Sequence, residues 1–226
     1  MRKKSHISLA RYMVESLNDE GLKKHKYSFY LGSILPDIKP SFLYKRHEMT
    51  GTFPHVRKDI ERLSEGRKII EKKKKGMKYY MDLGQISHYL ADYFTFPHDK
   101  TYGGSLKEHC SYEERLKKDL RSYIKSGEAA KNMRENASAK GEGAFHSADA
   151  LCRFIQNTHD KYIAQKHSME NEYSMENEYS MGNKYPMEEG RHQADDIHHI
   201  ISVNYHALKG MIELLAQKKT ERMLRN

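Results

Sequence analysis

Hydrophobic positions recur every three or four residues along most of the chain, which is the spacing of one face of an α-helix. In the segment 192–217, for example, Ile197, Ile200, Leu208 and Met211 follow this spacing. No segment of the chain shows a convincing strand pattern. The pattern therefore predicts an all-α protein, a single-domain helical bundle with helices over 5–18, 54–70, 77–96, 105–126, 144–166 and 192–217.

Helix-capping residues, glycine and proline mark the limits of the first segments. Ser5 is a suitable N-cap for the first helix, and Gly21 is expected to end it. The apolar segment 27–38 is broken by Gly32 and stopped by Pro36. We therefore expect the chain to turn shortly before Asp37, whose carboxylate either caps the next turn or points into a site.

Gly84 stands in the middle of the predicted helix 77–96, one turn before His88 and on the same face. A glycine in a helix interior costs about 1 kcal/mol relative to alanine. A glycine at such a position is expected where another part of the molecule occupies the space that a side chain would fill. We expect another chain segment, or a ligand, to approach closely at Gly84.

A tandem hexapeptide occupies residues 168–185 and reads SMENEY, SMENEY, SMGNKY. Three short polar copies are too few and too hydrophilic to bury a continuous core. The pattern predicts a mobile polar insertion over about 168–190 that carries no chemistry. The remainder of residues 1–226 is expected to form one domain.

Composition limits the class of protein but does not by itself indicate a function. Hydrophobic residues make up 37% of the chain and charged residues 31%, with a net charge of +9. The positive charge favours an anionic partner such as a phosphate ester, nucleic acid or lipid headgroup, although a lysine-coated helical surface explains it equally well. Two cysteines form no disulfide framework, and neither a secretory signal nor a membrane-spanning run is present. We expect a cytoplasmic protein.

Histidine and acidic residues four apart supply the candidate chemistry. Residues at this spacing share one helix face, about 5–6 Å apart between their Cβ atoms. With 14 histidines and 31 acidic residues in 226, about two such pairs arise by chance, so a single pair carries no information. The chain has four such pairs: His55/Asp59, His88/Asp92, His109/Glu113 and His192/Asp196.

The order of residues within Gly84–Glu113 is more informative than the count. His98 stands between the pairs His88/Asp92 and His109/Glu113, each of which lies on a predicted helix beside a proline or glycine turn. Imidazole nitrogens and carboxylate oxygens are ligands that suit zinc. We therefore predict a multinuclear zinc site at one end of the bundle. The pairs at 55/59 and 192/196 are expected to be coincidences, although His55 itself stays open as a ligand.

The motif HYLADYFTFPH…HCSYE resembles the metal signature of the zinc-dependent phospholipases C, His-x3-Asp-x5-His followed by His-x3-Glu. That family includes bacterial phosphatidylcholine-preferring enzymes and clostridial alpha-toxin, and the zinc nucleases that cut single strands are related to it. The resemblance extends upstream to KSHISLA and LGSILPDI…KRHE, so that it covers roughly residues 5–115 and a terminal packing helix. It does not cover 127–190.

The resemblance implies a set of ligands for each of three zinc ions. His47, His88 and Asp92 would hold the first, with Asp37 as a fourth ligand or as the base beside it. A second would be bound by the set His98, His109 and Glu113. A third would be bound by His6 and a shared Asp92.

Two of these implied ligands leave alternatives open. Family members also place a mature N-terminal amine at the third zinc, but His6 is only five residues from Met1. We therefore expect the third site to be incomplete, filled by water or empty, which leaves two zinc ions and an optional third. His47 is preferred to His55, because it follows Asp37 closely and Pro54 looks like a helix start.

The resemblance implies a phospholipase C-like phosphodiester hydrolase, in which a metal-activated water attacks phosphorus and Asp37 orients or deprotonates that water. The expected partners are a phospholipid substrate and a transiently bound membrane surface. A nuclease or other phosphodiesterase on the same scaffold is the first alternative, weakened by the absence of Trp and of a base-stacking platform. A metal-binding module without activity is the second.

Overall fold

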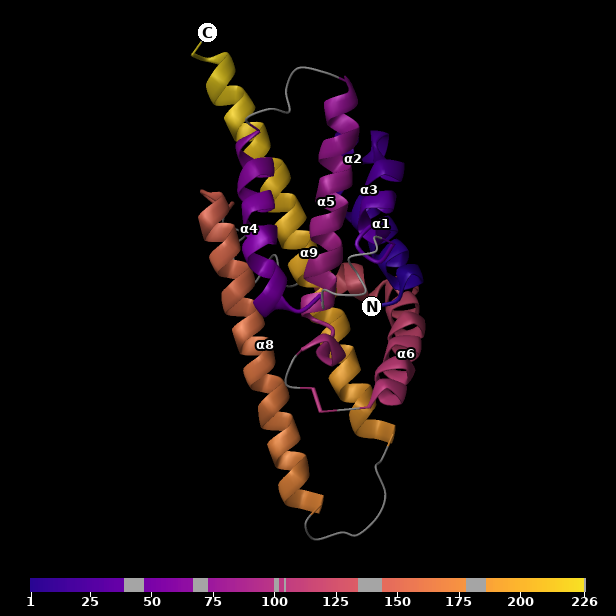
Figure 1. Ribbon diagram of the computed structural model, residues 1–226. Coiled ribbons are helices and arrows are strands. Elements are labelled where there is room, and N and C mark those ends of the chain that lie inside the picture. Colours follow the sequence, from indigo (N-terminus) through magenta and orange to yellow (C-terminus); the bar gives the residue numbers. More distant parts are fainter. Residues whose placement is uncertain are drawn as a thin grey trace.

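The computed structural model describes residues 1–38, 47–66, 73–99, 102–103, 105–133, 144–177 and 186–225, with side chains except at 73–75, 169–177 and 186–192. Its regular elements within these ranges are helices, and no strand occurs in them (Figure 1). The prediction of an all-α protein is therefore confirmed. The elements are α1 (Lys3–Leu17), α2 (Glu20–Lys24), α3 (Lys26–Ile34), α4 (Met49–Glu65), α5 (Lys73–Tyr93), the 3-10 turn η2 (Phe96–His98), α6 (Leu106–Lys125), α8 (Ala148–Asn177) and α9 (Pro186–Met223).

The first helix begins two residues earlier than predicted, and Gly21 does not end it. It begins at Lys3, so that Ser5 lies buried within its first turn and caps nothing. It ends at Asn18, which adopts a left-handed conformation with φ of 53°. Asparagine tolerates this conformation better than most residues, and a left-handed residue is a common helix terminator. Gly21 lies instead inside α2, which Asp19 caps by accepting from the backbone N–H of Leu22.

Two residues that were expected to limit helical segments, Pro54 at a start and Gly32 at a break, lie inside helices. Pro54 falls within α4, which starts five residues earlier than predicted, at Met49. Pro54 is the sixth residue of α4, so it removes the backbone hydrogen bond to the carbonyl of Thr50 and its ring crowds that carbonyl. Gly32 likewise does not interrupt α3, which continues to Ile34.

Gly32 and Gly84 allow α3 and α5 to approach each other closely. A Cβ atom on Gly84 would lie 2.2 Å from the carbonyl oxygen of Phe29, and one on Gly32 would lie 2.0 Å from that of Met81. Both distances are far below van der Waals contact, so neither position accepts a side chain without moving a backbone. The predicted close approach at Gly84 is confirmed, and its partner is the backbone of α3.

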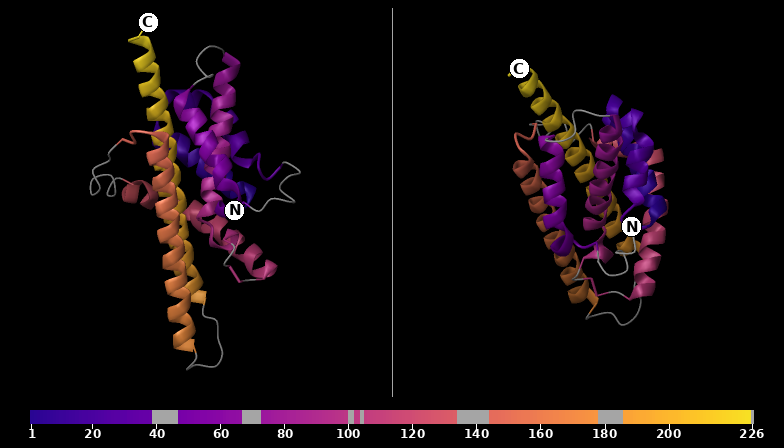
Figure 2. Two further views of the ribbon diagram at one scale, coloured as in Figure 1. Left: turned by 60° about the vertical axis from the view of Figure 1, so that its left-hand side comes forward. Right: turned by 45° about the horizontal axis from the view of Figure 1, so that its top comes forward.

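The long helix α9 supports the other helices along most of their length. It contacts α4, α5 and α8, and it pairs with α8 so that the two extend beyond the remaining helices (Figure 2). The core between the helices is apolar and includes Leu83, Leu90, Ile200, Leu208 and Met211. Among the described residues, none of the helices combines the length and apolar character that a membrane crossing requires.

The hexapeptide repeats begin on a helix. The backbone of α8 continues through residues 168–177, so this helix runs further than the predicted 144–166. Residues 178–185 lie outside the described residues, and α9 starts at Pro186. The mobile insertion therefore stays a prediction for the second half of the repeats.

Candidate metal centre

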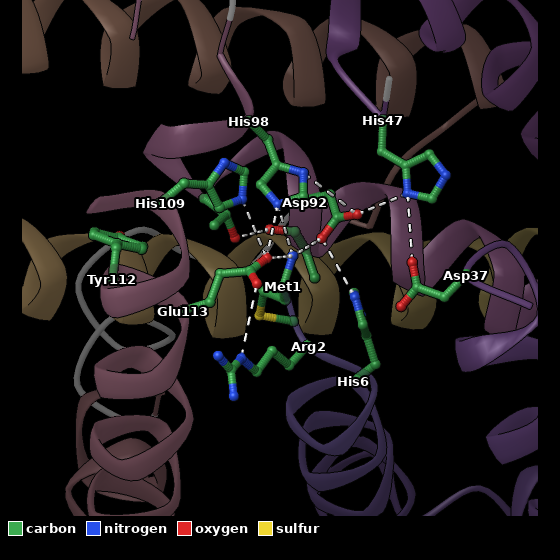
Figure 3. A network of polar contacts seen from close by, with 12 residues as sticks. Met1, Arg2, His6, Asp37, His47, Asp92, His98, His109, Tyr112 and Glu113 are labelled. Carbon is green, nitrogen blue, oxygen red and sulfur yellow. Dashed lines mark hydrogen bonds and ion pairs between the residues drawn. The ribbon is translucent and has the colours of Figure 1, made fainter. Parts of the chain in front are cut away.

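Three groups of histidine and acidic side chains meet where the C-terminal ends of α3 and α5 reach the N-terminus of α1 and the first half of α6 (Figure 3). Within each group the candidate ligand atoms lie within 4.8 Å of one another. The groups are His6/His88/Asp92, Asp37/His47/His88 and His98/His109/Glu113. All eight residues that the sequence analysis selected as metal ligands are thus brought together.

Asp92 is the centre of this arrangement. It is fully buried in the last turn of α5. Its Oδ1 atom lies 2.6 Å from the Met1 amine and 3.3 Å from His6 Nε2. Its Oδ2 atom lies 3.0 Å from His47 Nδ1 and 3.2 Å from His88 Nε2. The two oxygens therefore face different nitrogen sets, which is the geometry of a carboxylate that bridges two cations.

The orientation of His88 is fixed by the close packing of α3 on α5. Its Nδ1 atom lies 2.9 Å from the carbonyl oxygen of Ser33 and must carry the proton, because a carbonyl only accepts hydrogen bonds. In the neutral ring, Nε2 then presents a lone pair to the carboxylates of Asp37 and Asp92, 3.7 Å and 3.2 Å away. His47 Nδ1 lies 3.0 Å from the same atom. Acceptors that converge in this way fit a metal cation between them, and a backbone carbonyl is a common outer partner of a metal-bound histidine.

His6 provides a second test of whether a metal fits. Both of its ring nitrogens are buried without a hydrogen-bond partner among the described residues. Burial, followed by the nearby His88, lowers the pKa of His6 to about 3, so the ring is neutral at pH 7. An unsatisfied polar group in the interior is costly. A metal ion beside Nε2 would satisfy one of these nitrogens, so the residues present fit the ion.

The group on η2 and α6 is the most accessible of the three. Glu113 Oε1 lies 3.2 Å from His98 Nε2 and 3.4 Å from His109 Nε2. The side chain of His109 is 29% exposed, whereas those of His88 and Asp92 are fully buried. Solvent therefore reaches this group more easily than the other two.

The charges in the centre depend on the Met1 amine. Burial alone would lower its pKa, but Asp92 and Glu113 outweigh burial and raise it above its usual value. Burial likewise opposes ionisation of Asp92, yet the amine and then His98 hold the pKa of that carboxyl well below its usual range. The ammonium group lies 2.9 Å from His98 Nε2 and 3.4 Å from Glu113 Oε1. The carboxylates of Asp92 and Glu113 thus favour a positive charge at this position.

The Met1 amine is the site group that the sequence analysis missed. The short spacing between Met1 and His6 predicts a third site that is incomplete, filled by water or empty. The structure corrects this geometry: Arg2 is extended, with φ of −74° and ψ of 147°, and carries Met1 across to Asp92. Arg2 also pairs with Glu114 on α6, which fixes the start of the chain. The signal available in the sequence was the short spacing itself, because one extended residue, Arg2, joins Met1 to the helix that carries His6.

The remaining candidate ligands differ in burial and in whether they belong to one of the three groups. His47 is buried in the centre, whereas His55 is exposed on α4 and belongs to none of the three groups. Cys110 is exposed and also stands outside them. Asp196 is buried but lies apart from the three groups, and the side chain of His192 lies outside the described residues. Zinc ions at the three groups would have nitrogen and oxygen ligands of the kind that this metal prefers.

Comparison with known proteins identifies a family. A family model described as zinc dependent phospholipase C matches residues 5–169, a range that contains the eight predicted ligands and not Met1. No curated protein and no solved structure matched the chain.

Proposed function

The chain belongs to the zinc-dependent phospholipase C family, and we propose that it hydrolyses a phosphodiester bond of a phospholipid with the help of two or three zinc ions. The observation that carries this proposal is the shared carboxylate of Asp92, whose two oxygens face the nitrogens of His6 and of His47 and His88. Bound zinc lowers the pKa of water and polarises phosphoryl oxygens. The chain itself supplies the ligands and their orientation.

Asp37 is the candidate base. Its Oδ1 atom lies 3.7 Å from His88 Nε2 and 3.9 Å from His47 Nδ1, at the edge of the first group. Burial raises the pKa of this carboxyl, which brings it closer to the range that a general base needs at neutral pH. In the proposed reaction Asp37 accepts a proton of the attacking water at a carboxylate oxygen. The side chain otherwise serves as a fourth ligand.

The proposed reaction breaks the bond between phosphorus and the glycerol oxygen. The water oxygen forms the new bond to phosphorus, and the alcohol leaves with a proton as diacylglycerol, together with a phosphorylated headgroup. Glu113, His98 and His109 hold the accessible side of the centre, where the phosphate group would enter. A phospholipid substrate also implies a transient encounter with a membrane surface.

Metal analysis of the purified protein is the first test, and fewer than one equivalent of zinc would contradict every catalytic proposal. Hydrolysis of phosphatidylcholine vesicles, single-stranded DNA and bis(4-nitrophenyl) phosphate is then compared with and without a chelator. We expect chelator-sensitive turnover of the lipid. Turnover of DNA without turnover of lipid would make the protein a nuclease instead, and zinc binding without any turnover would make it a metal-binding module.

A further inference from the structure

A buried carboxylate on α9, that of Asp196, lies outside the three metal groups and is surrounded by donors. It accepts from the backbone N–H of Phe96 over 3.3 Å and from the hydroxyl of Tyr112, both at Oδ2. At Oδ1 it accepts from the hydroxyl of Tyr162 over 3.0 Å and lies 2.6 Å from Lys166 Nζ. A carboxylate has about four lone-pair positions, so these four donors use its accepting capacity.

The two donors at Oδ2 come from the two elements that carry the accessible metal group. Phe96 begins η2 and precedes His98 by two residues, and Tyr112 precedes Glu113 directly on α6. Asp196 Oδ2 therefore contacts both η2 and α6, next to the positions of His98 and Glu113. Gln193, also on α9, donates to the Tyr112 carbonyl oxygen over 2.8 Å and strengthens the tie to α6.

The two groups at Oδ1 hold Asp196 itself in place. Lys166 on α8 is fully buried, and its Nζ also lies 3.2 Å from Asp195 Oδ2. Burial raises the pKa of Asp196 well above its usual range, whereas the four donors around it favour the carboxylate. A buried ion pair of this kind contributes little to stability, because the cost of desolvating both charges offsets their attraction. The contact between Lys166 and Asp196 is better explained by its effect on the orientation of Asp196. The ammonium and Tyr162 hold one oxygen of Asp196, so that the other oxygen faces η2 and α6.

We propose that Asp196 is a positioning residue for the metal group His98/His109/Glu113, and that it acts through Tyr112 and the backbone of Phe96. The consequence for catalysis rests on the proposed function, but the effect on metal binding does not. Outer partners that orient metal ligands typically contribute about 10–100-fold to metal affinity. Loss of the contact to α6 should therefore be visible in zinc binding itself.

Tyr112→Phe and Tyr162→Phe provide a matched pair of variants. Each removes one hydroxyl that donates to Asp196, but only Tyr112 lies on a helix that carries metal ligands. Zinc affinity is measured by competition with a chromophoric chelator, and folding by circular dichroism. We expect Tyr112→Phe to weaken one class of zinc site by about tenfold. Tyr162→Phe should change affinity far less, although both variants lose some thermal stability.

Asp196→Asn, with Asp82→Asn as its control, extends the test. Asp82 is also buried and pairs with Arg62 and Lys78, but it has no contact with η2 or α6. We expect a larger loss of zinc affinity in Asp196→Asn than in Tyr112→Phe and none in Asp82→Asn. Should Asp196→Asn fail to fold, the tyrosine pair still decides the question.

The outcomes separate this inference from the proposed function. Unchanged zinc affinity in Tyr112→Phe, or an equal loss in both tyrosine variants, would overturn the positioning role even if the wild-type protein hydrolyses phospholipid. A selective loss in Tyr112→Phe would support it even if no phosphodiester is turned over. A wild-type protein that binds no zinc would overturn both.

Discussion

The amine of Met1 and the carboxylate of Asp92 lie 2.6 Å apart in the interior of the protein, although 91 positions separate them in the chain. This contact brings the first residue to the end of α5, beside His6, His98 and Glu113. A zinc ion at this position would have to replace the proton on the amine. The Met1 amine therefore lies within the centre in this structure.

Addition of one glycine before Met1 tests the role of the amine. The former amine becomes an uncharged amide, and the new amine is displaced from Asp92. We expect the extended protein to retain fewer zinc equivalents and to lose at least about tenfold in hydrolysis, as removal of a ligand predicts. The same glycine added after Asn226, beyond the exposed Met223 and Leu224, is the control. Equal zinc content in the two proteins would contradict a role for the amine.

Asp92→Asn removes a carboxylate whose two oxygens face nitrogens of two of the metal groups, Oδ1 toward His6 and Oδ2 toward His47 and His88. An amide offers one oxygen in place of two and carries no charge, so we expect loss of zinc from both groups and a fall in hydrolysis of at least about 100-fold. Zinc content and turnover of bis(4-nitrophenyl) phosphate are the measurements. Asp82→Asn, on the same helix and also buried, should lose stability and keep its zinc. Full activity in Asp92→Asn would refute the shared-carboxylate role.

Gly84→Ala tests the contact between α3 and α5. The new Cβ would lie 2.2 Å from the Phe29 carbonyl oxygen, so the helices must separate, at a cost of about 1–3 kcal/mol in the free energy of unfolding. Because Ser33 moves with α3, the hydrogen bond that orients His88 should weaken and zinc affinity should fall. Urea unfolding and chelator competition measure the two effects.

Gly51→Ala is the matched control for that variant. Gly51 is exposed on α4, and a Cβ atom there would meet nothing within 4 Å. We expect this variant to be as stable as the wild type or more stable by up to about 1 kcal/mol, since alanine is the better helix former. If Gly84→Ala behaved in the same way, the close approach would not constrain the site.

The metal-free protein should lose stability as the pH falls. The pKa of His6 is lowered from 6.5 in the unfolded chain to about 3 in the folded protein, so the unfolded state binds more protons between these values. Stability is then present above pH 6.5 and declines toward pH 3, by at most about 1.4 kcal/mol per pH unit from this group. Urea unfolding of chelator-treated protein at pH 7, 6 and 5 measures the slope.

His6→Gln separates this effect from other titrations. Glutamine does not titrate, so the variant should show a flatter dependence over the same range, above the pH at which carboxyl groups with ordinary pKa values begin to bind protons. The comparison uses the slopes and not the absolute stabilities, because the substitution itself disturbs a buried position. Parallel slopes would show that His6 does not govern the pH dependence.

The sequence by itself determined the helical class and the ligand types. Hydrophobic spacing located the helices, and the pairs His88/Asp92 and His109/Glu113 were readable because residues four apart on a helix must share a face. Gly84 was recognisable as a close approach for the same local reason. Helix limits were less certain, since the positions of Ser5, Gly32 and Pro54 depend on what packs around them.

Tertiary structure decided which distant groups complete the centre. In the structure Met1 contacts Asp92, and His47 is buried in the centre whereas His55 is exposed. Four donors also surround Asp196 in the interior. No local pattern encodes these contacts, because each joins elements whose relative position is set by packing between helices. Backbone geometry fixes what lies within one or two turns of a helix, whereas the meeting of α1, α3, α5, α6 and α9 depends on the whole core.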